Sequence, residues 1–167
     1  MATHRADIWG SATLPDTSGN TWFEPASISQ PTNDRYPQLV ARFKDTATKD
    51  SIGGNFRVPK NFVSAPVIYV LWTTTATSGN AIWNFDYTAI AKSGESVDPS
   101  ADQQALTVTT AAPGTTQLTQ ESSMSATAGN FAVDDLVQFK LSRNGAGSDT
   151  IAADLIVYGL VFEYADA

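Results

Sequence analysis

Residues 153–164 read ADLIVYGLVFEY, and this stretch decides the fold. As a β-strand it carries apolar residues on both faces, because alternate side chains point to opposite sides. One face holds Leu155, Val157, Gly159 and Val161, and the other holds Ile156, Tyr158, Leu160, Phe162 and Tyr164. A strand of an antiparallel sheet usually has one wet face. We therefore expect this strand to be central in the fold or to press against another subunit.

Residues 66–72, PVIYVLW, share this property, since Val67, Tyr69 and Leu71 alternate with three further apolar residues. Two such strands in a chain of 167 residues predict a subunit interface as well as a core. The pattern leaves open which face is core and which is interface. Candidates for the core or the oligomer interface are Tyr69, Leu71, Ile156, Tyr158, Leu160 and Phe162.

Composition and charge exclude several classes of protein. The length suits one domain with a sizeable core. The net charge is −7, and the ten lysine and arginine residues are scattered singly, which argues against a nucleic-acid partner. The absence of cysteine excludes disulfides, thiolate zinc sites and cysteine nucleophiles.

The first fifteen residues, MATHRADIWGSATLP, lack the apolar run of a signal peptide, and no segment has the length of a membrane span. We therefore expect synthesis in the cytoplasm and no membrane partner.

Short apolar runs punctuated by glycine and proline predict an all-β protein with about eight to ten strands, typical of an antiparallel sandwich of jelly-roll type. We expect an irregular N-terminal arm over residues 1–34 and the jelly-roll sandwich over 35–167. The polar segment 44–51, KDTATKDS, is expected to be solvated. Strands are expected at 6–12, 21–24, 36–43, 52–58, 66–74, 81–91, 104–111, 116–127, 136–143 and 153–164.

The residue types needed for catalysis are scarce, so we predict neither an enzyme nor a cofactor. The one histidine, His4, lies in a terminus that we expect to be frayed and solvated, which leaves no base for a catalytic triad and no multi-histidine metal site. A loop with Glu95, Asp98 and Asp102, and the pair Asp134 and Asp135, could offer oxygens to calcium, but their spacing is not that of an EF-hand. A glycosidase needs only two positioned carboxylates, which the sequence cannot place. Solvated carboxylates are the favoured interpretation.

Four tryptophans could serve packing or recognition. Trp72 and Trp83 lie in strongly apolar strands and are expected in the core or an interface. Trp9 and Trp22 are the candidates for stacking on sugar rings, as aromatic residues do in carbohydrate-binding sandwiches. Packing is the favoured interpretation for each of them.

Two segments resemble structural proteins of tailed bacteriophages. Residues 56–91, FRVPKNFVSAPVIYVLWTTTATSGNAIWNFDYTAIA, combine an apolar strand, a TSGN-type hairpin and an aromatic strand. Residues 134–164, DDLVQFKLSRNGAGSDTIAADLIVYGLVFEY, continue the resemblance. The first fifty residues carry no part of it. The spacing in the second segment is carried by Arg143, Gly145, Asp149, Thr150, Ala153, Asp154, Leu155, Tyr158, Gly159, Phe162 and Tyr164.

The resemblance implies a capsid decoration (cement) protein with a tumour-necrosis-factor-like sandwich, located on the outer capsid surface of a virion. Such a virion component is made in the host cytoplasm and released by lysis. Such a protein forms a homotrimer and stabilises the shell by bridging neighbouring copies of the major capsid protein. Residues 1–34 would then be the capsid-contacting arm, because irregular segments ordered by a partner have this composition. The alternative is a glycan- or receptor-binding jelly-roll module of a phage tail or fibre, using Trp9 or Trp22.

Overall fold

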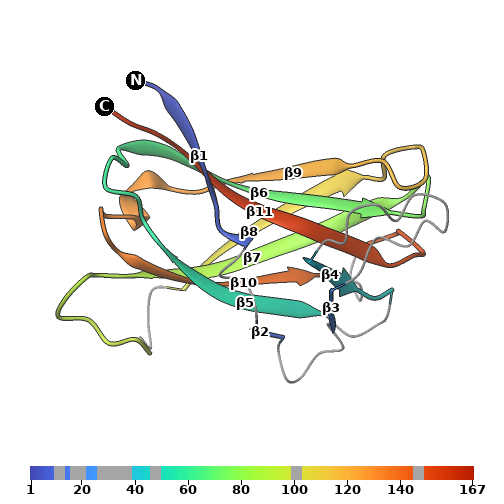
Figure 1. Cartoon of the computed structure of the whole chain (residues 1–167), viewed down its shortest axis with the longest axis horizontal. Coiled ribbons are helices and arrows are strands. Elements are labelled where there is room, and N and C mark those ends of the chain that lie inside the picture. The colour runs from blue at the N-terminus through green and yellow to red at the C-terminus, as the bar shows by residue number, and fades with distance from the viewer. Residues whose placement is uncertain (10–13, 16–21, 26–38, 46–49, 99–102, 145–148) are drawn as a thin grey trace.

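The computed structural model describes residues 1–9, 14–15, 22–25, 39–45, 50–98, 103–144 and 149–167. These residues form two antiparallel sheets packed face to face as a jelly-roll sandwich (Figure 1). The β11 sheet has the order β3 (Trp22–Pro25), β4 (Leu39–Phe43), β11 (Leu155–Ala165), β6 (Ser64–Thr74) and β9 (Gln120–Ser125), and β1 (Thr3–Asp7) also pairs with β11. The β10 sheet has the order β2 (Leu14–Pro15), β5 (Ser51–Arg57), β10 (Leu136–Arg143), β7 (Asn80–Ile90) and β8 (Gln104–Ala111).

The all-β jelly-roll prediction is confirmed, and most predicted strands lie within a few residues of the observed ones. The bounds of β8 and β10 agree with the prediction. The strand β9 is shorter than predicted because the chain turns before it, where Gln117 has a φ of 60° and donates its backbone N–H to the carbonyl of Thr74. A short 3₁₀ helix, η2 (Ala128–Asn130), follows β9.

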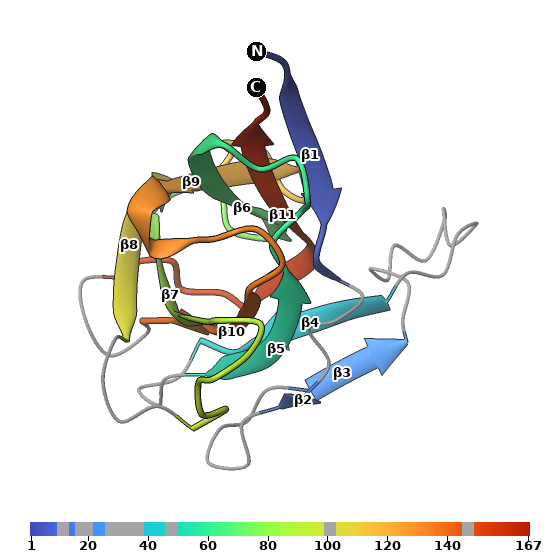
Figure 2. The ribbon, with the colours of Figure 1, turned by 90° about the vertical axis from the view of Figure 1, so that its left-hand side faces the viewer.

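Three strands of the segment 1–34 belong to the sheets of the sandwich: β1 pairs with β11, β2 with β5, and β3 with β4. The two ends of the chain therefore lie side by side (Figure 2). His4 is held in β1, where Nε2 lies 2.8 Å from Oδ2 of Asp166 and the ring stacks on Tyr164. The prediction of a frayed terminus at His4 is wrong, because pairing with β11 orders this end, although the side chain of His4 is still 40% exposed. A capsid contact by residues 1–34 stays a prediction.

The sequence predicts a solvated segment over residues 44–51, but two of its described residues are buried. Asp50 is 1% exposed and Ser51 is 2% exposed. The backbone carbonyl of Asp50 accepts the N–H of Arg143, and its carboxylate accepts the N–H of Lys44. Polar composition was misleading here because these polar groups bond to the backbone of neighbouring strands.

A β-bulge in β11 changes which side chains face the core. The register to β6 steps from Val157 opposite Trp72 to Gly159 opposite Leu71, so Tyr158 is an extra residue. Before the bulge Leu155 and Val157 are buried, and after it the large buried side chains are those of Leu160, Phe162 and Tyr164. The predicted strict alternation through 153–164 is wrong from this point, because an inserted residue shifts every later side chain to the other face.

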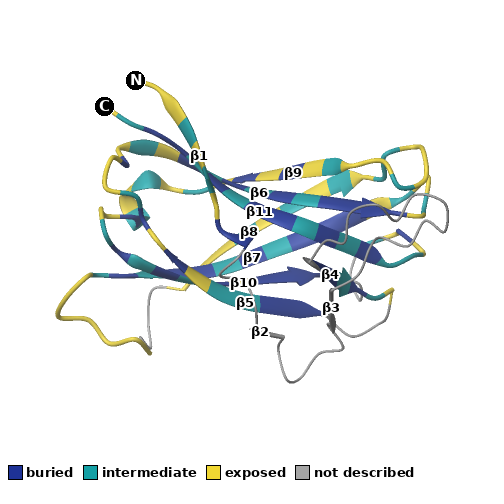
Figure 3. Cartoon of the chain, in the orientation of Figure 1, coloured by how far each residue is buried: buried dark blue, intermediate teal, exposed yellow. Residues whose placement is uncertain are grey.

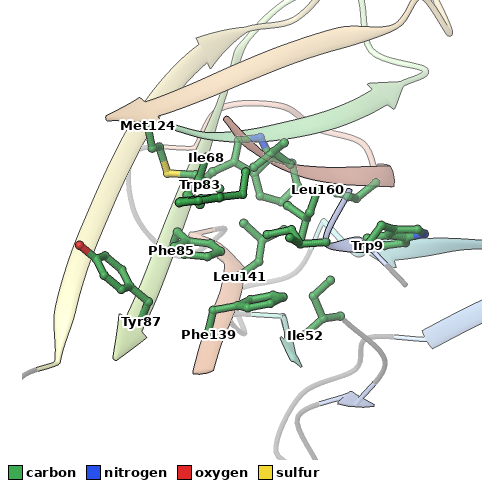
Figure 4. Packing of buried hydrophobic residues seen from close by; sticks show 14 of the residues in the cluster. Trp9, Ile52, Ile68, Trp83, Phe85, Tyr87, Met124, Phe139, Leu141 and Leu160 are labelled. Atoms are coloured by element: carbon green, nitrogen blue, oxygen red, sulfur yellow. The ribbon is translucent and has the colours of Figure 1, made fainter. Parts of the chain in front are cut away.

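The core fills the space between the sheets, where the strands carry most of the buried residues (Figure 3), and it is rich in aromatic rings (Figure 4). Trp72 and Trp83, both 0% exposed, meet edge to face with centroids 6.0 Å apart, as expected of core residues. Around the fully buried Phe162, rings approach to centroid distances of 5.0 Å for Phe56 and 5.7 Å for Phe131. Burial of these large apolar groups is the main source of the stability of the sandwich.

The bulge has a testable steric consequence at Gly159. A Cβ at this position would lie 2.8 Å from Cδ1 of Leu71 and 3.4 Å from its Cβ. We expect Gly159→Ala to destabilise the fold by about 0.5–1.5 kcal/mol, since the outward side chain of Leu71 must leave its present rotamer. In urea unfolding, Leu71→Ala in the same chain should remove most of this cost, and equal costs in both backgrounds would contradict the contact.

Candidate functional site

The outer face of the β11 sheet carries a group of partly buried apolar side chains. In β6 the residues that point away from the core are Val67, Tyr69 and Leu71, between the fully buried Ile68, Val70 and Trp72. In β11 the outward residues include Ile156, Tyr158 and Val161. Because Val161 lies opposite Tyr69 and Gly159 lies opposite Leu71, the two rows are neighbours. We call these six outward residues, Val67, Tyr69, Leu71, Ile156, Tyr158 and Val161, the outer apolar patch.

Charged side chains border the outer apolar patch on the β1 and β9 sides. The guanidinium of Arg5 lies 4.5 Å from the ring centroid of Tyr69. Nε of Arg5 donates to Glu163 at 2.7 Å, and one of its terminal nitrogens lies 3.4 Å from Glu121. The hydroxyl of Tyr69 donates to the other oxygen of Glu163 at 3.1 Å. An apolar centre with a polar rim is the arrangement found at protein–protein interfaces.

The tyrosines of the patch are neutral at physiological pH. Burial is the main reason why the pKa of Tyr158 is raised, and a hydrogen bond with Thr119 opposes that shift. Burial also raises the pKa of Tyr69, and the hydrogen bond to Glu163 adds to it. The hydroxyl of Tyr69 donates to Glu163 beside an apolar surface, which suits a contact that is only partly hydrated.

A shallow open groove of about 210 Å³ lies on the outer face of the β10 sheet. Its polar side chains are Asp86 and Thr88 of β7, Gln138 and Lys140 of β10, and Gln103 just before β8. Tyr87 and Phe139 also line it, although their side chains pack in the core. We call this the polar groove.

The strand register places the groove side chains in two rows. Gln138 lies between Asn55 of β5 and Thr88 of β7, and Lys140 lies opposite Asp86. Nζ of Lys140 is 3.4 Å from Oδ2 of Asp86, so the two charges of the groove compensate each other. On the β5 side, Lys140 lies opposite Gly53, which has no side chain to contribute to the groove.

Another hollow, of about 230 Å³, lies where η2 approaches β7 and β8. It is lined by Tyr87, Ala89, Gln104, Gly129 and Asn130. The amide of Asn130 donates to the hydroxyl of Tyr87 at 3.1 Å, and burial raises the pKa of this tyrosine. The ring of Tyr87 stacks on Phe131 at 5.1 Å. These contacts fix the end of the sandwich and bring no nucleophile or base into the hollow.

The structure separates the six sequence candidates into two groups. Leu160 and Phe162 lie in the core and are 0% exposed. The other four, Tyr69, Leu71, Ile156 and Tyr158, belong to the outer apolar patch. Sequence reasoning missed the polar groove formed by Asp86, Thr88, Gln138 and Lys140, because the pairing of β7 with β10 is not visible in the sequence.

The two sugar-stacking candidates differ in what the structure describes. Trp9 is 8% exposed and belongs to the hydrophobic core, so it offers no open ring face (Figure 4). Trp22 begins β3 opposite Arg42, and its side chain lies outside the described part of the chain.

The spaced motif within residues 134–164 has a structural role, since its side chains stabilise the fold. Arg143 is 1% exposed, and its Nε and one terminal nitrogen each lie 3.0 Å from an oxygen of Asp149. It also donates to the carbonyls of Ile151, at 2.6 Å, and Ala153, at 2.8 Å. The side chains of Thr150 and Asp154 accept hydrogen bonds from the backbone N–H groups of Asn80 and Asp45, respectively. These motif residues hold the connection into β11, and Gly145 lies outside the described residues.

Three of the acidic residues considered for calcium, Glu95, Asp134 and Asp135, have protein partners. Asp134 pairs with Lys92 at 3.1 Å, and this hydrogen bond is the main reason why its pKa is lowered. The N–H of Ala91 donates to Glu95, and that of Ala132 donates to Asp135. In the described ranges no three acidic or histidine side chains gather as a metal site requires, and Asp102 lies outside those ranges. No helix among the same residues is both long and apolar enough to cross a bilayer.

Topology and burial define the chain as a jelly-roll β-sandwich, and solved structures share this fold. The chain is similar to the C-terminal family 6 carbohydrate-binding module of the laminarinase LamC from Zobellia galactanivorans, with 11% identity, a TM-score of 0.50 and coverage of 98% of this chain and 100% of that one. It is also similar to a family 35 carbohydrate-binding module from Cellvibrio japonicus, with 9% identity, a TM-score of 0.51 and 99% coverage of both chains. No family model and no curated protein sequence matches the chain. At these identities the likeness shows the fold alone.

Proposed function

We propose that the protein is a virion structural protein, a capsid decoration protein that forms a homotrimer and bridges neighbouring copies of the major capsid protein. The observation that carries the proposal is the outer apolar patch on the β11 sheet, with Tyr69, Leu71, Ile156 and Tyr158 directed away from the core. The sequence resemblance in residues 56–91 and 134–164 supports the virion context.

Self-association through this patch has a clear physical basis. Removing its apolar area from water contributes roughly 25 cal/mol per Å². A threefold ring repeats one interface three times, so each contact contributes three times to the free energy of trimer formation. Arg5 and Glu121 at the rim have opposite charges and can set the orientation of neighbouring chains.

The first test is the mass in solution. We expect light scattering to give three times the 17.8 kDa of one chain. Ile156→Lys should produce monomers with an unchanged far-UV spectrum, because burying an unpaired ammonium costs more than about 2 kcal/mol per interface. The matched control is Thr109→Lys on exposed β8 of the other sheet, which should leave the trimer intact. A monomeric wild-type protein at tens of micromolar would contradict the proposal.

The second measurement is co-sedimentation with purified capsids that lack the protein. We expect saturable binding at a fixed number of copies per particle and greater resistance of the shell to heat. A trimer that fails to bind such capsids would remove the decoration role and keep the self-association.

A second candidate function is binding of a glycan or receptor by a tail or fibre module. It is favoured by the polar groove and by the likeness in fold to carbohydrate-binding modules. The groove lies on the outer face of the sheet opposite the outer apolar patch, so self-association through the patch leaves it open. The two functions are therefore compatible in one molecule.

A further inference from the structure

We propose that the polar groove across β7 and β10 is a binding site for a neutral saccharide, a terminal sugar or a short oligosaccharide. This inference rests on the second candidate function and names its site and ligand class. It places recognition at Asp86, Thr88, Gln138 and Lys140, away from the tryptophans that the sequence suggested.

The hydrogen-bonding groups of the groove match a ligand with many hydroxyls. Asp86 offers two acceptor oxygens, Lys140 offers donors, and the amides of Gln138 and Gln103 offer both. A sugar hydroxyl donates one hydrogen bond and accepts others, so it can use each of these groups. The side chains stand on paired strands, which fix their spacing better than a loop does.

The charge of the groove selects against ionic ligands. Lys140 and Asp86 form an ion pair at 3.4 Å, with side chains 48% and 33% exposed, so each remains open to a further partner. An anionic ligand would meet the carboxylate of Asp86, and a cationic ligand would meet the ammonium of Lys140. The chain as a whole carries −7, which adds to the repulsion of anions.

The dimensions of the groove limit the length of the ligand. Its volume of about 210 Å³ is below the roughly 300 Å³ at which sites for drug-sized molecules begin. The residues lining it are polar side chains and the backbone of two core residues, so no aromatic platform adds stacking energy. We therefore expect weak binding by one chain, in the millimolar range, which a trimer would strengthen through multivalency.

The test uses the full chain on an array of neutral and acidic oligosaccharides, followed by NMR titration with the best ligand. We expect a neutral saccharide to bind and to shift the amide signals of residues 86–88 and 138–140. Asp86→Ala and Gln138→Ala should each weaken binding about tenfold. Matched controls are Thr109→Ala on the same sheet and Ser125→Ala on the other, both exposed, which should bind like the wild type.

The outcomes separate the site from the function. Binding that is unchanged in both groove variants would overturn this site and leave glycan binding elsewhere on the chain. Binding of acidic saccharides alone would overturn the ligand class. Absence of any saccharide binding at millimolar concentration would overturn both the site and the second candidate function, and it would leave the trimer measurement unaffected.

Discussion

Arg143→Met is expected to lower the free energy of unfolding by about 3–5 kcal/mol. Arg143 is 1% exposed and holds Asp149, which is equally buried, through two contacts of 3.0 Å. Removing the guanidinium leaves the carboxylate of Asp149 buried without its cation. It also leaves the carbonyls of Ile151 and Ala153 without their donor. Urea unfolding of the purified variant measures the loss.

A matched control is Arg5→Met, which removes an arginine that also forms two ion pairs. Its side chain is 52% exposed, and water screens the charges of exposed pairs, so we expect a much smaller loss of stability. The double variant Arg143→Met, Asp149→Leu should lose less stability than Arg143→Met alone, because it removes the uncompensated charge. Equal costs for Arg143→Met and Arg5→Met would show that the connection into β11 does not depend on the buried pair.

Local patterns in the sequence predict the strands well where alternation is regular. In β10, Val137, Phe139 and Leu141 alternate with polar residues, and both predicted ends agree with the structure. The same reasoning fails in β11, because a bulge adds one residue within a run that is apolar on both faces, so the alternation itself does not reveal it. The presence of Gly159, which leaves room for Leu71, was the available signal.

Contacts between distant segments could not be predicted, since they depend on strand pairing. The motif containing Arg143 and Asp149 was visible as a spacing, but their burial arises from the approach of Phe43 and Ile151. His4 was placed in a frayed end because its partners lie more than 150 residues away in β11 and after it. The polar groove likewise exists only because Lys140 pairs with Asp86 across two strands.

Phe162→Ala is expected to destabilise the fold by about 3–5 kcal/mol, as large-to-small changes at buried aromatic positions do. Phe162 is 0% exposed, and its ring lies 5.0 Å from Phe56 and 5.7 Å from Tyr164. The loss would open a cavity between the sheets that the surrounding rings can fill only in part. Unfolding in urea should be measured in the Ile156→Lys background, so that association does not contribute.

The matched control is Tyr158→Ala. Tyr158 is an aromatic residue of the same strand, and it lies an even number of positions away from Phe162. Strict alternation would place Tyr158 and Phe162 on one face and give the two changes similar costs. The bulge instead turns Tyr158 outward, so we expect its removal to cost the monomer about 1 kcal/mol and to weaken trimer formation in the wild-type background. Similar costs in the monomer would refute the bulge. They would also remove Tyr158 from the outer apolar patch on which the proposed trimer depends.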